Sequence, residues 1–132
     1  MYEAHGWFGL AETPSEADEG ALLGKVHEID DVIREQRWPT TVAASLHALN
    51  GQYWLVLTVF ANRRREEVVW VDDLLDLVSQ RLPGSWGILY ERDDEMPVPP
   101  GPNAFRVTVF GRGRTSKRLD PFLSPCIPII ED

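Results

Sequence analysis

Residues 41–60 read TVAASLHALNGQYWLVLTVF and decide the fold. Two runs rich in β-forming residues, 41–49 and 52–60, flank the dipeptide Asn50-Gly51. This dipeptide is the favoured connection of a two-residue β-hairpin, because both of its positions adopt positive φ. The stretch therefore predicts two adjacent antiparallel strands joined by a tight turn.

The residues before this hairpin predict a strand followed by a helix. Residues 2–10 alternate as a strand does. The two faces of that strand are Ala4, Gly6, Phe8 and Leu10 on one side and His5 and Trp7 on the other. Thr13, Pro14 and Glu16 match the start of a helix with a capping box. An apolar stripe then indicates a helix that ends near Trp38-Pro39; its members are Leu22, Val26, Ile29 and Ile33.

The residues after the hairpin predict a second helix and two more strands. A basic loop at residues 62–65 leads into a helix over about 66–82, which Pro83-Gly84 ends. The inward stripe of this helix is Val71, Leu74, Leu75, Val78 and Leu82. Residues 86–92 and 105–112 have the pattern of strands, and the loop between them, 93–103, is too rich in proline for a β-ladder.

The order of these segments predicts the fold class. The order β-α-β-β-α-β-β is typical of an α+β fold in which two helices cover one face of a mostly antiparallel sheet, here with five strands. A chain of 132 residues has the size of one domain, so we expect residues 1–132 to form a single domain.

The C-terminal segment, residues 120–132, combines three prolines with five large apolar side chains. The prolines exclude a helix interior or a central strand, whereas the apolar side chains favour burial. We therefore expect an extended tail packed against the body of the protein. The sheet face opposite the helices is a suitable surface for it, because Trp7, Trp54 and Trp86 are expected to point to that side.

The charge of the chain favours a basic partner. Twenty-one acidic and thirteen basic residues give a net charge of -8, with about -10 in residues 1–95 and about +2 in residues 96–132. Such a surface repels phosphates and attracts basic macromolecules. One cysteine forms no internal disulfide and no cysteine-based zinc site. Because no secretory signal or membrane-spanning run is present, we expect a cytoplasmic protein without a membrane partner.

An enzyme is an alternative that the sequence leaves open. His5 and His47 fall on the same expected sheet face, and Cys126 supplies a thiol. The chain contains no Gly-x-Ser-x-Gly elbow, no His-Glu-x-x-His, no phosphate-binding glycine loop and no dinucleotide fingerprint. We therefore expect no catalysis and no cofactor, with Cys126 acting as a small buried hydrophobe.

Two further alternatives involve ions and nucleic acids. The acidic run at residues 93–95 lacks the alternating spacing of a calcium loop, so we expect no metal site there. Residues 103–118 contain five bases and no acids, and the part from Arg112 to Arg118 has the charge needed to follow phosphates. The negative total favours pairing of these bases within the protein over nucleic-acid binding.

Three segments of the chain resemble the immunity protein 7 family of bacterial polymorphic-toxin systems. They are Met1–Trp7, Pro83–Tyr90 with the acids at 93–95, and Asp120–Pro128, of which the last is the most specific. The resemblance runs from end to end. It implies an α+β immunity protein, encoded beside a secreted toxin, that protects the cell by binding the catalytic domain of that toxin and has no catalysis of its own.

The family motif residues are expected to serve as scaffold. They are His5, Gly6, Trp7, Asn62, Pro83, Gly84, Trp86, Asp120, Pro121, Phe122, Pro125 and Cys126. The chain departs from the family pattern after the hairpin, where an Asn-His-Arg element is expected and Asn62-Arg63-Arg64-Arg65 stands. A role for that histidine does not carry over, and we expect Asn62 to cap or brace the second helix.

Residues that select the toxin are expected outside these motifs, because specificity is built from variable charge and shape. The candidates are acids on the second helix, in the long loop and on the first helix: Asp72, Asp73 and Asp76; Asp93, Asp94 and Glu95; and Glu16, Asp18 and Glu19. A nuclease is the favoured class of toxin, since clefts that bind phosphates are basic. The sequence does not indicate the oligomeric state.

Overall fold

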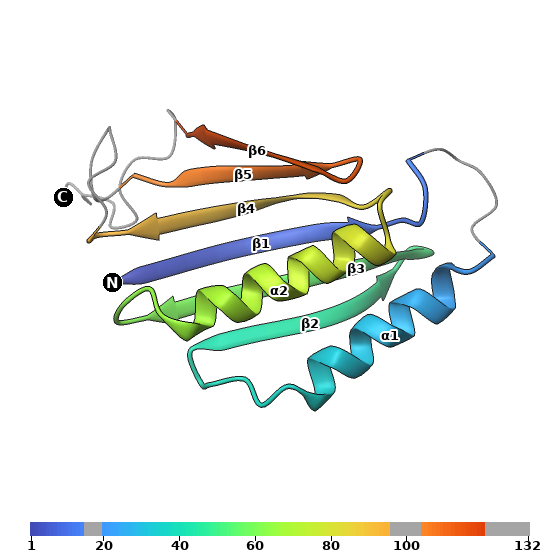
Figure 1. The fold of residues 1–132 in the computed structure, drawn as a ribbon, viewed down its shortest axis with the longest axis horizontal. Coiled ribbons are helices and arrows are strands. Elements are labelled where there is room, and N and C mark those ends of the chain that lie inside the picture. The colour runs from blue at the N-terminus through green and yellow to red at the C-terminus, as the bar shows by residue number, and fades with distance from the viewer. Residues whose placement is uncertain (15–19, 96–103, 121–132) are drawn as a thin grey trace.

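A computed structural model describes residues 1–14, 20–95 and 104–120 of the chain. Eight helices and strands follow one another in this part, as Figure 1 shows. Their bounds are β1 (Tyr2–Leu10), α1 (Leu22–Glu35), β2 (Val42–Leu49), β3 (Gln52–Ala61), α2 (Glu66–Arg81), β4 (Trp86–Asp93), β5 (Arg106–Gly111) and β6 (Arg114–Leu119). The expected α+β class is confirmed.

The strands form one sheet in the order β2-β3-β1-β4-β5-β6, and every neighbouring pair is antiparallel. The strand β1 lies in the interior between β3 and β4, whereas β2 and β6 are the edges. Both helices lie on one face of this sheet, and β5 and β6 extend past them (Figure 1). Among the described residues, no helix covers the other face.

The hairpin expected at residues 41–60 is confirmed. Asn50 and Gly51 both have positive φ, 50° and 76°, which is the conformation that a tight hairpin turn needs. The ladder pairs Leu49 with Gln52 next to the turn. This local signal therefore fixes the register of two of the six strands.

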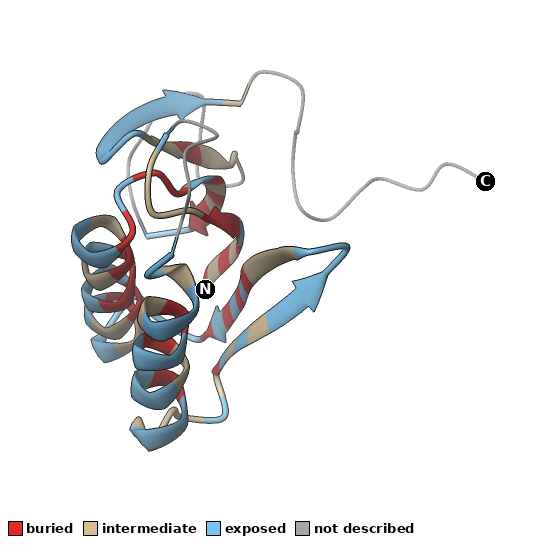
Figure 2. Cartoon of the chain, turned by 90° about the vertical axis from the view of Figure 1, so that its right-hand side faces the viewer, coloured by how far each residue is buried: buried red, intermediate tan, exposed pale blue. Residues whose placement is uncertain are grey.

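The core lies between the sheet and the helices, where Figure 2 shows the buried residues. The alternation of β1 is confirmed, because Ala4, Phe8 and Leu10 are buried while Trp7 is exposed. The expected inward stripe of α2 is buried along its whole length, and so are Val26, Ile29 and Ile33 of α1. The spacing of the apolar residues in each segment is therefore sufficient to identify its buried side.

The helix ends differ from the sequence-based expectation at two points. The helix α1 begins at Leu22, after Thr13 and Pro14, and Ala21 is its N-cap. The N-cap of α2 is Arg65, and no side chain in the described residues caps either helix, so the capping role expected for Asn62 is wrong. Tertiary packing stabilises these helices without side-chain caps.

The sheet has six strands, so the expectation of five is wrong. Arg112 and Gly113 have φ of 53° and 70° and form a second tight turn, after which β6 pairs with β5. Every residue of β6 is exposed, so the strand has no alternation of buried and exposed residues to detect in the sequence. The strand β4 also continues one residue further than expected, through Asp93.

Several sequence-based predictions fall outside the described residues. They concern Glu16, Asp18 and Glu19, the tail with Pro121, Phe122 and Pro125, and Cys126. Within the described residues, neither helix is long and apolar enough to cross a membrane.

Candidate functional site

The three aspartates of α2 lie on two different flanks of the helix. All three are exposed. Successive residues of a helix are turned by about 100°, so Asp72 and Asp73 point in clearly different directions, and Asp76 lies between them, about 40° from Asp72 and about 60° from Asp73. Asp73 faces a cavity shared with α1, whereas Asp72 lies near the Glu91 and Lys117 charges of β4 and β6. The aspartates of one short run thus belong to two surfaces.

The cavity beside Asp73 lies between the end of α1 and the middle of α2. It encloses about 230 Å³ and is lined by Val32, Gln36, Trp38, Trp70, Asp73, Leu74 and Leu77. The rings of Trp38 and Trp70 meet edge to face, with centroids 6.0 Å apart and planes at 82°. Val32 and Asp73 are exposed. The walls are therefore aromatic and aliphatic, with one carboxylate at the edge.

The position of Trp38 is fixed by the end of α1. Gln36 is the C-cap, and its backbone N–H donates to the carbonyl of Val32 at 3.0 Å. The chain then turns back, and the indole Nε1 of Trp38 donates to the carbonyl oxygen of Ile33 at 2.9 Å. The indole thereby satisfies one of the carbonyls that a helix end leaves unpaired. This bond holds the ring beside the helix, facing α2.

The two helices are also joined between the middle of α1 and the end of α2. Arg81 near the end of α2 donates to both carboxylate oxygens of Glu28 in α1, each at 2.8 Å. An exposed pair of this kind adds little stability, but its bidentate geometry fixes the relative position of the helices. The cavity therefore lies between two helices that are connected by the Trp38–Trp70 contact and by the Arg81–Glu28 pair.

The helical layer carries most of the negative charge. Nine acids and three bases lie on α1 and α2. Each of the three bases pairs with an acid, since Lys25 lies 2.7 Å from Glu12, Arg34 lies 2.7 Å from Asp30, and Arg81 binds Glu28. The hydrogen bond from Lys25 also lowers the pKa of Glu12. The remaining acids give the outer surface of the helices an uncompensated negative charge.

The opposite flank of α2 belongs to a structural cluster. The buried hydroxyl of Tyr2 donates to Glu91 Oε1 at 2.8 Å, and Arg64 Nη2 lies 3.9 Å from the same oxygen. Burial, with the nearby Glu91 charge, raises the pKa of Tyr2 well above its usual value. Desolvation and Glu91 also raise the pKa of Asp72, which Arg64 partly opposes. These charges join β1 and β4 to the start of α2.

The acids at the end of β4 lie in a third place, beside the N-terminus. Asp93 is buried within the strand and accepts a hydrogen bond from the backbone N–H of Glu95 at 3.1 Å. Asp94 accepts a hydrogen bond from the N-terminal ammonium, which lowers the pKa of that carboxyl. Glu95 lies 3.5 Å from Arg63. Of the three, Asp94 and Glu95 remain exposed.

The open face of the sheet holds His5 and His47 and several aromatic side chains. His5 Nε2 lies 2.6 Å from Glu3 Oε1, and His47 Nε2 lies 2.9 Å from Ser45 Oγ. The register places His5 opposite Thr58 and His47 opposite Trp54, four residues apart along β3. That offset corresponds to about 13 Å along the sheet, so the two imidazoles share a face and do not form a pair.

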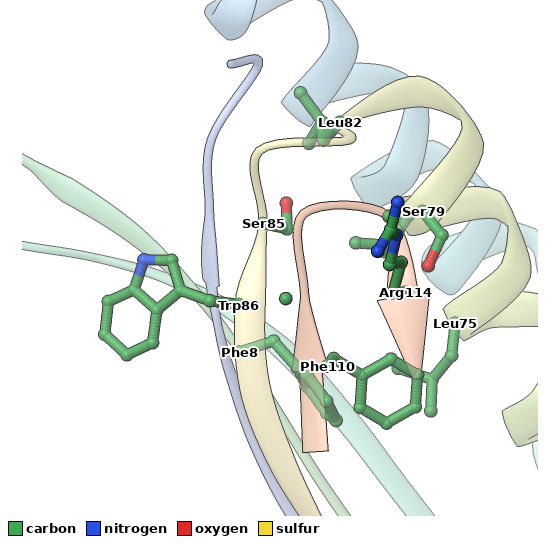
Figure 3. Close-up of a pocket in the computed structure, with 11 residues that line it drawn as sticks. Phe8, Leu75, Ser79, Leu82, Ser85, Trp86, Phe110 and Arg114 are labelled. Atoms are coloured by element: carbon green, nitrogen blue, oxygen red, sulfur yellow. The ribbon is translucent and has the colours of Figure 1, made fainter. Parts of the chain in front are cut away.

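A second cavity lies where the turn between β5 and β6 meets the end of α2 (Figure 3). Phe8, Leu75, Ser79, Phe110 and Arg114 are among its lining residues. Its volume of about 10 Å³ is on the scale of a single water molecule. It is a packing gap, too small for a ligand. Among the described residues, no group of three or more His, Cys, Asp or Glu side chains could hold a metal ion.

Comparison with known families identifies the relationship of the chain. The sequence model of the family described as immunity protein 7 matches residues 1–132, the whole chain. The chain belongs to the immunity protein 7 family. Comparison with curated proteins and with solved structures gave no match.

Four of the residues that resemble the immunity protein 7 motifs make close contacts within the described part of the chain: Gly6, Gly84, Trp7 and Trp86. A Cβ atom on Gly6 would lie 2.8 Å from Phe8 Cε2, and one on Gly84 would overlap the backbone of Thr13. Trp7 stacks on Tyr90, with ring centroids 5.9 Å apart, and Trp86 meets Trp54 edge to face at 5.1 Å. Pro83-Gly84 follows the end of α2, as expected.

The sequence does not predict the cavity between α1 and α2. Trp38-Pro39 indicates only where the first helix ends, and the predicted stripe of the second helix is the one that packs on the sheet. A second stripe is present in the sequence, at Trp70, Leu74 and Leu77 with spacings of four and three residues. One apolar stripe of a helix is enough to pack on a sheet. A further stripe therefore indicates a second apolar contact, and in α2 this signal points to the cavity.

Proposed function

We propose that this chain is an immunity protein that binds and neutralises the catalytic domain of a cognate secreted bacterial toxin. The observation that carries the proposal is the match to the immunity protein 7 family over the whole chain. We further propose that the toxin domain is basic and that a nuclease is its favoured class, because a cleft that binds phosphates is basic. Inhibition then requires affinity and placement, without a chemical step by the immunity protein.

The charge distribution supports a basic partner. The outer surface of the helical layer carries the uncompensated acids, and it is displayed on two helices joined by Arg81–Glu28 and Trp38–Trp70. A negative surface speeds the encounter with a positive cleft, while a small number of central contacts sets the residence time. The helical layer is therefore the surface that we propose for the toxin.

Co-expression tests the proposed function. The protein is produced together with the product of the neighbouring gene, and growth, co-purification and the association rate are measured. We expect rescue of growth, a stable complex and an association rate that falls as salt rises, because salt screens exposed charges. A toxin domain that stays fully active beside an excess of this protein refutes the proposal for that pair. An association rate independent of salt refutes the electrostatic part alone.

We also propose that residues 121–132 pack on the open face of the sheet. Three observations support this placement. Trp7, Trp86 and Phe60 on that face are 42%, 45% and 54% exposed. The N–H of Asp120 donates to the carbonyl oxygen of Phe105 at 3.3 Å, so the described chain ends at the edge of the sheet. A twelve-residue extended segment spans at most about 40 Å, and six strands are about 24 Å across.

Truncation after Asp120 tests the placement of the tail. We expect a lower melting temperature and a red shift of tryptophan emission, because the removed apolar side chains would expose the indoles. Removal of residues 131–132, which are both acidic, is the matched control and should change neither. Unchanged stability and emission of the chain that ends at residue 120 would show that the tail does not cover this face.

A further inference from the structure

We propose that the cavity between α1 and α2 receives an arginine side chain of the toxin domain. The inference rests on the proposed function. It places the central contact with the toxin domain at this cavity of the helical layer. Asp73 differs from the other candidate acids in its role, because its carboxylate lines the cavity. The aromatic part of the site is Trp38 and Trp70.

The size of the cavity fits one side chain. Its volume of about 230 Å³ is several times the share of one water molecule and below the range typical of small-molecule sites, about 300–1,000 Å³. It lies between two helices on an outer surface, with the exposed Val32 at its edge. A side chain that enters from a partner can therefore be buried there without rearrangement of the sheet.

The chemistry of the walls favours arginine over an apolar side chain. A guanidinium is planar and weakly hydrated, so it stacks on indole faces while its stem contacts aliphatic groups such as Leu74 and Leu77. The carboxylate of Asp73 accepts its N–H donors in a charge-assisted hydrogen bond. Gln36, at the end of α1, also lines the cavity, and its amide oxygen is a further acceptor of N–H groups. An apolar anchor would leave the Asp73 carboxylate beside a hydrophobic group.

The surrounding charges also favour a cation from outside. The three bases on α1 and α2 are paired with acids of the protein, as the ion pairs of Lys25, Arg34 and Arg81 show. Arg37 is exposed and precedes Trp38 in the sequence, so it is the cation of this chain to test as a competitor. Arg37→Ala should leave toxin binding unchanged or strengthen it. Arginine is also among the residues that most often dominate the energy of an interface.

A titration that does not need the toxin tests the cavity itself. The full chain is titrated with N-acetylarginine amide, and with the neutral isostere N-acetylcitrulline amide, while the indole N–H signals are followed by NMR. The Trp38→Phe and Trp70→Phe variants assign the two signals. We expect saturable shifts of these signals with the arginine compound and much smaller shifts with the citrulline compound. Shifts that do not saturate, or that citrulline reproduces, overturn the proposal.

A pair of isosteric variants then tests the cavity in the complex. Asp73→Asn should weaken toxin binding by about tenfold or more, mainly through faster dissociation, because it leaves the bound guanidinium without its charged partner. Asp76→Asn removes the same charge from the neighbouring turn of α2, at a residue that does not line the cavity, and should change the affinity by less than about threefold. Equal effects of the two variants overturn the proposal. A toxin domain that does not bind at all refutes the proposed function, while the arginine titration still decides whether the cavity binds a cation.

Discussion

The two faces of the sheet differ in how far their side chains are removed from water. On β1, Phe8 points toward the helices and is 2% exposed, whereas its neighbour Trp7 points to the open face and is 42% exposed. On β3, Leu55, Leu57 and Val59 are buried, whereas Val56 and Phe60, which point to the other face, are exposed. The strands β1 and β3 thus each contribute to one closed and one open surface, because successive side chains alternate across a sheet.

This difference indicates where stability and binding are located. The covered face encloses the aliphatic core, and the helices that cover it turn their acids outward. The open face instead carries indole and phenol rings in contact with one another, such as Trp7 on Tyr90 and Trp54 against Trp86. We therefore expect substitutions on the covered face to act on folding, and those on the open face to depend on what packs against it.

The largest difference is expected between two adjacent residues of β1. Phe8→Ala removes a ring that packs edge to face on Phe110, with centroids 5.2 Å apart, and should cost about 3–5 kcal/mol. Trp7→Ala removes a larger ring that is half in solvent, and should cost at least about 1 kcal/mol less. Urea unfolding of both variants measures the difference. Equal costs would mean that the open face is as well packed as the core.

The glycines of β1 compare the same two faces by adding a methyl group. A Cβ on Gly6 would lie 2.8 Å from the buried Phe8 ring and 3.1 Å from Leu89, so Gly6→Ala should cost about 1–3 kcal/mol. A Cβ on Gly9 would lie 2.7 Å from the Trp86 ring, which is exposed and able to rotate away. Gly9→Ala should therefore change the free energy of unfolding by less than about 1 kcal/mol. A larger cost at Gly9 would indicate that Trp86 is held in place by the tail.

The next comparison is between two tyrosines on the covered face, Tyr2 and Tyr53. Tyr2→Phe leaves Glu91 buried without the hydroxyl that donates to it, and should cost about 1–3 kcal/mol in urea unfolding at neutral pH. Tyr53→Phe is the control, because Tyr53 is only half-buried on the same face of β3. That substitution should stay within about 0.5 kcal/mol. A Tyr2→Phe effect no larger than that of the control would show that Arg64 alone satisfies Glu91.

Local and periodic features of the fold could be predicted from the sequence. The turn at Asn50-Gly51 is determined by two adjacent residues, and the buried stripes of β1 and α2 follow from periods of 2 and 3.6 residues. The strand β6 could not be predicted in this way, because all of its side chains are exposed and carry no alternation. The start of α1 at Leu22 also differs from the capping signal at Thr13, because Ala21, which is the N-cap, has no side chain that could mark the position in the sequence.

The candidate site was predictable only in part, because it depends on which elements become neighbours. The sequence selects Asp72, Asp73 and Asp76 as exposed acids, and all three are exposed. It does not show that Asp73 faces Trp38, which is 35 positions away, while Asp72 lies near Glu91. Nor does it show that Asp93 is buried in β4. The net charge follows from the composition. Which surface each charged residue lies on depends on the tertiary structure.

The smallest expected effect concerns Asp72, where charge meets the covered face. Desolvation and the Glu91 carboxylate raise the pKa of Asp72 in the folded protein above its unfolded value. The folded state therefore binds more protons than the unfolded state between these two pKa values, and stability is lost as the pH rises through that window. Asp72→Asn, which is neutral at every pH, should stabilise the protein slightly at pH 7. The gain should vanish near about pH 3, where the carboxyl is protonated in both states. Urea midpoints at the two pH values measure it, and a gain that persists in acid would mean that the amide stabilises the fold for a reason other than charge.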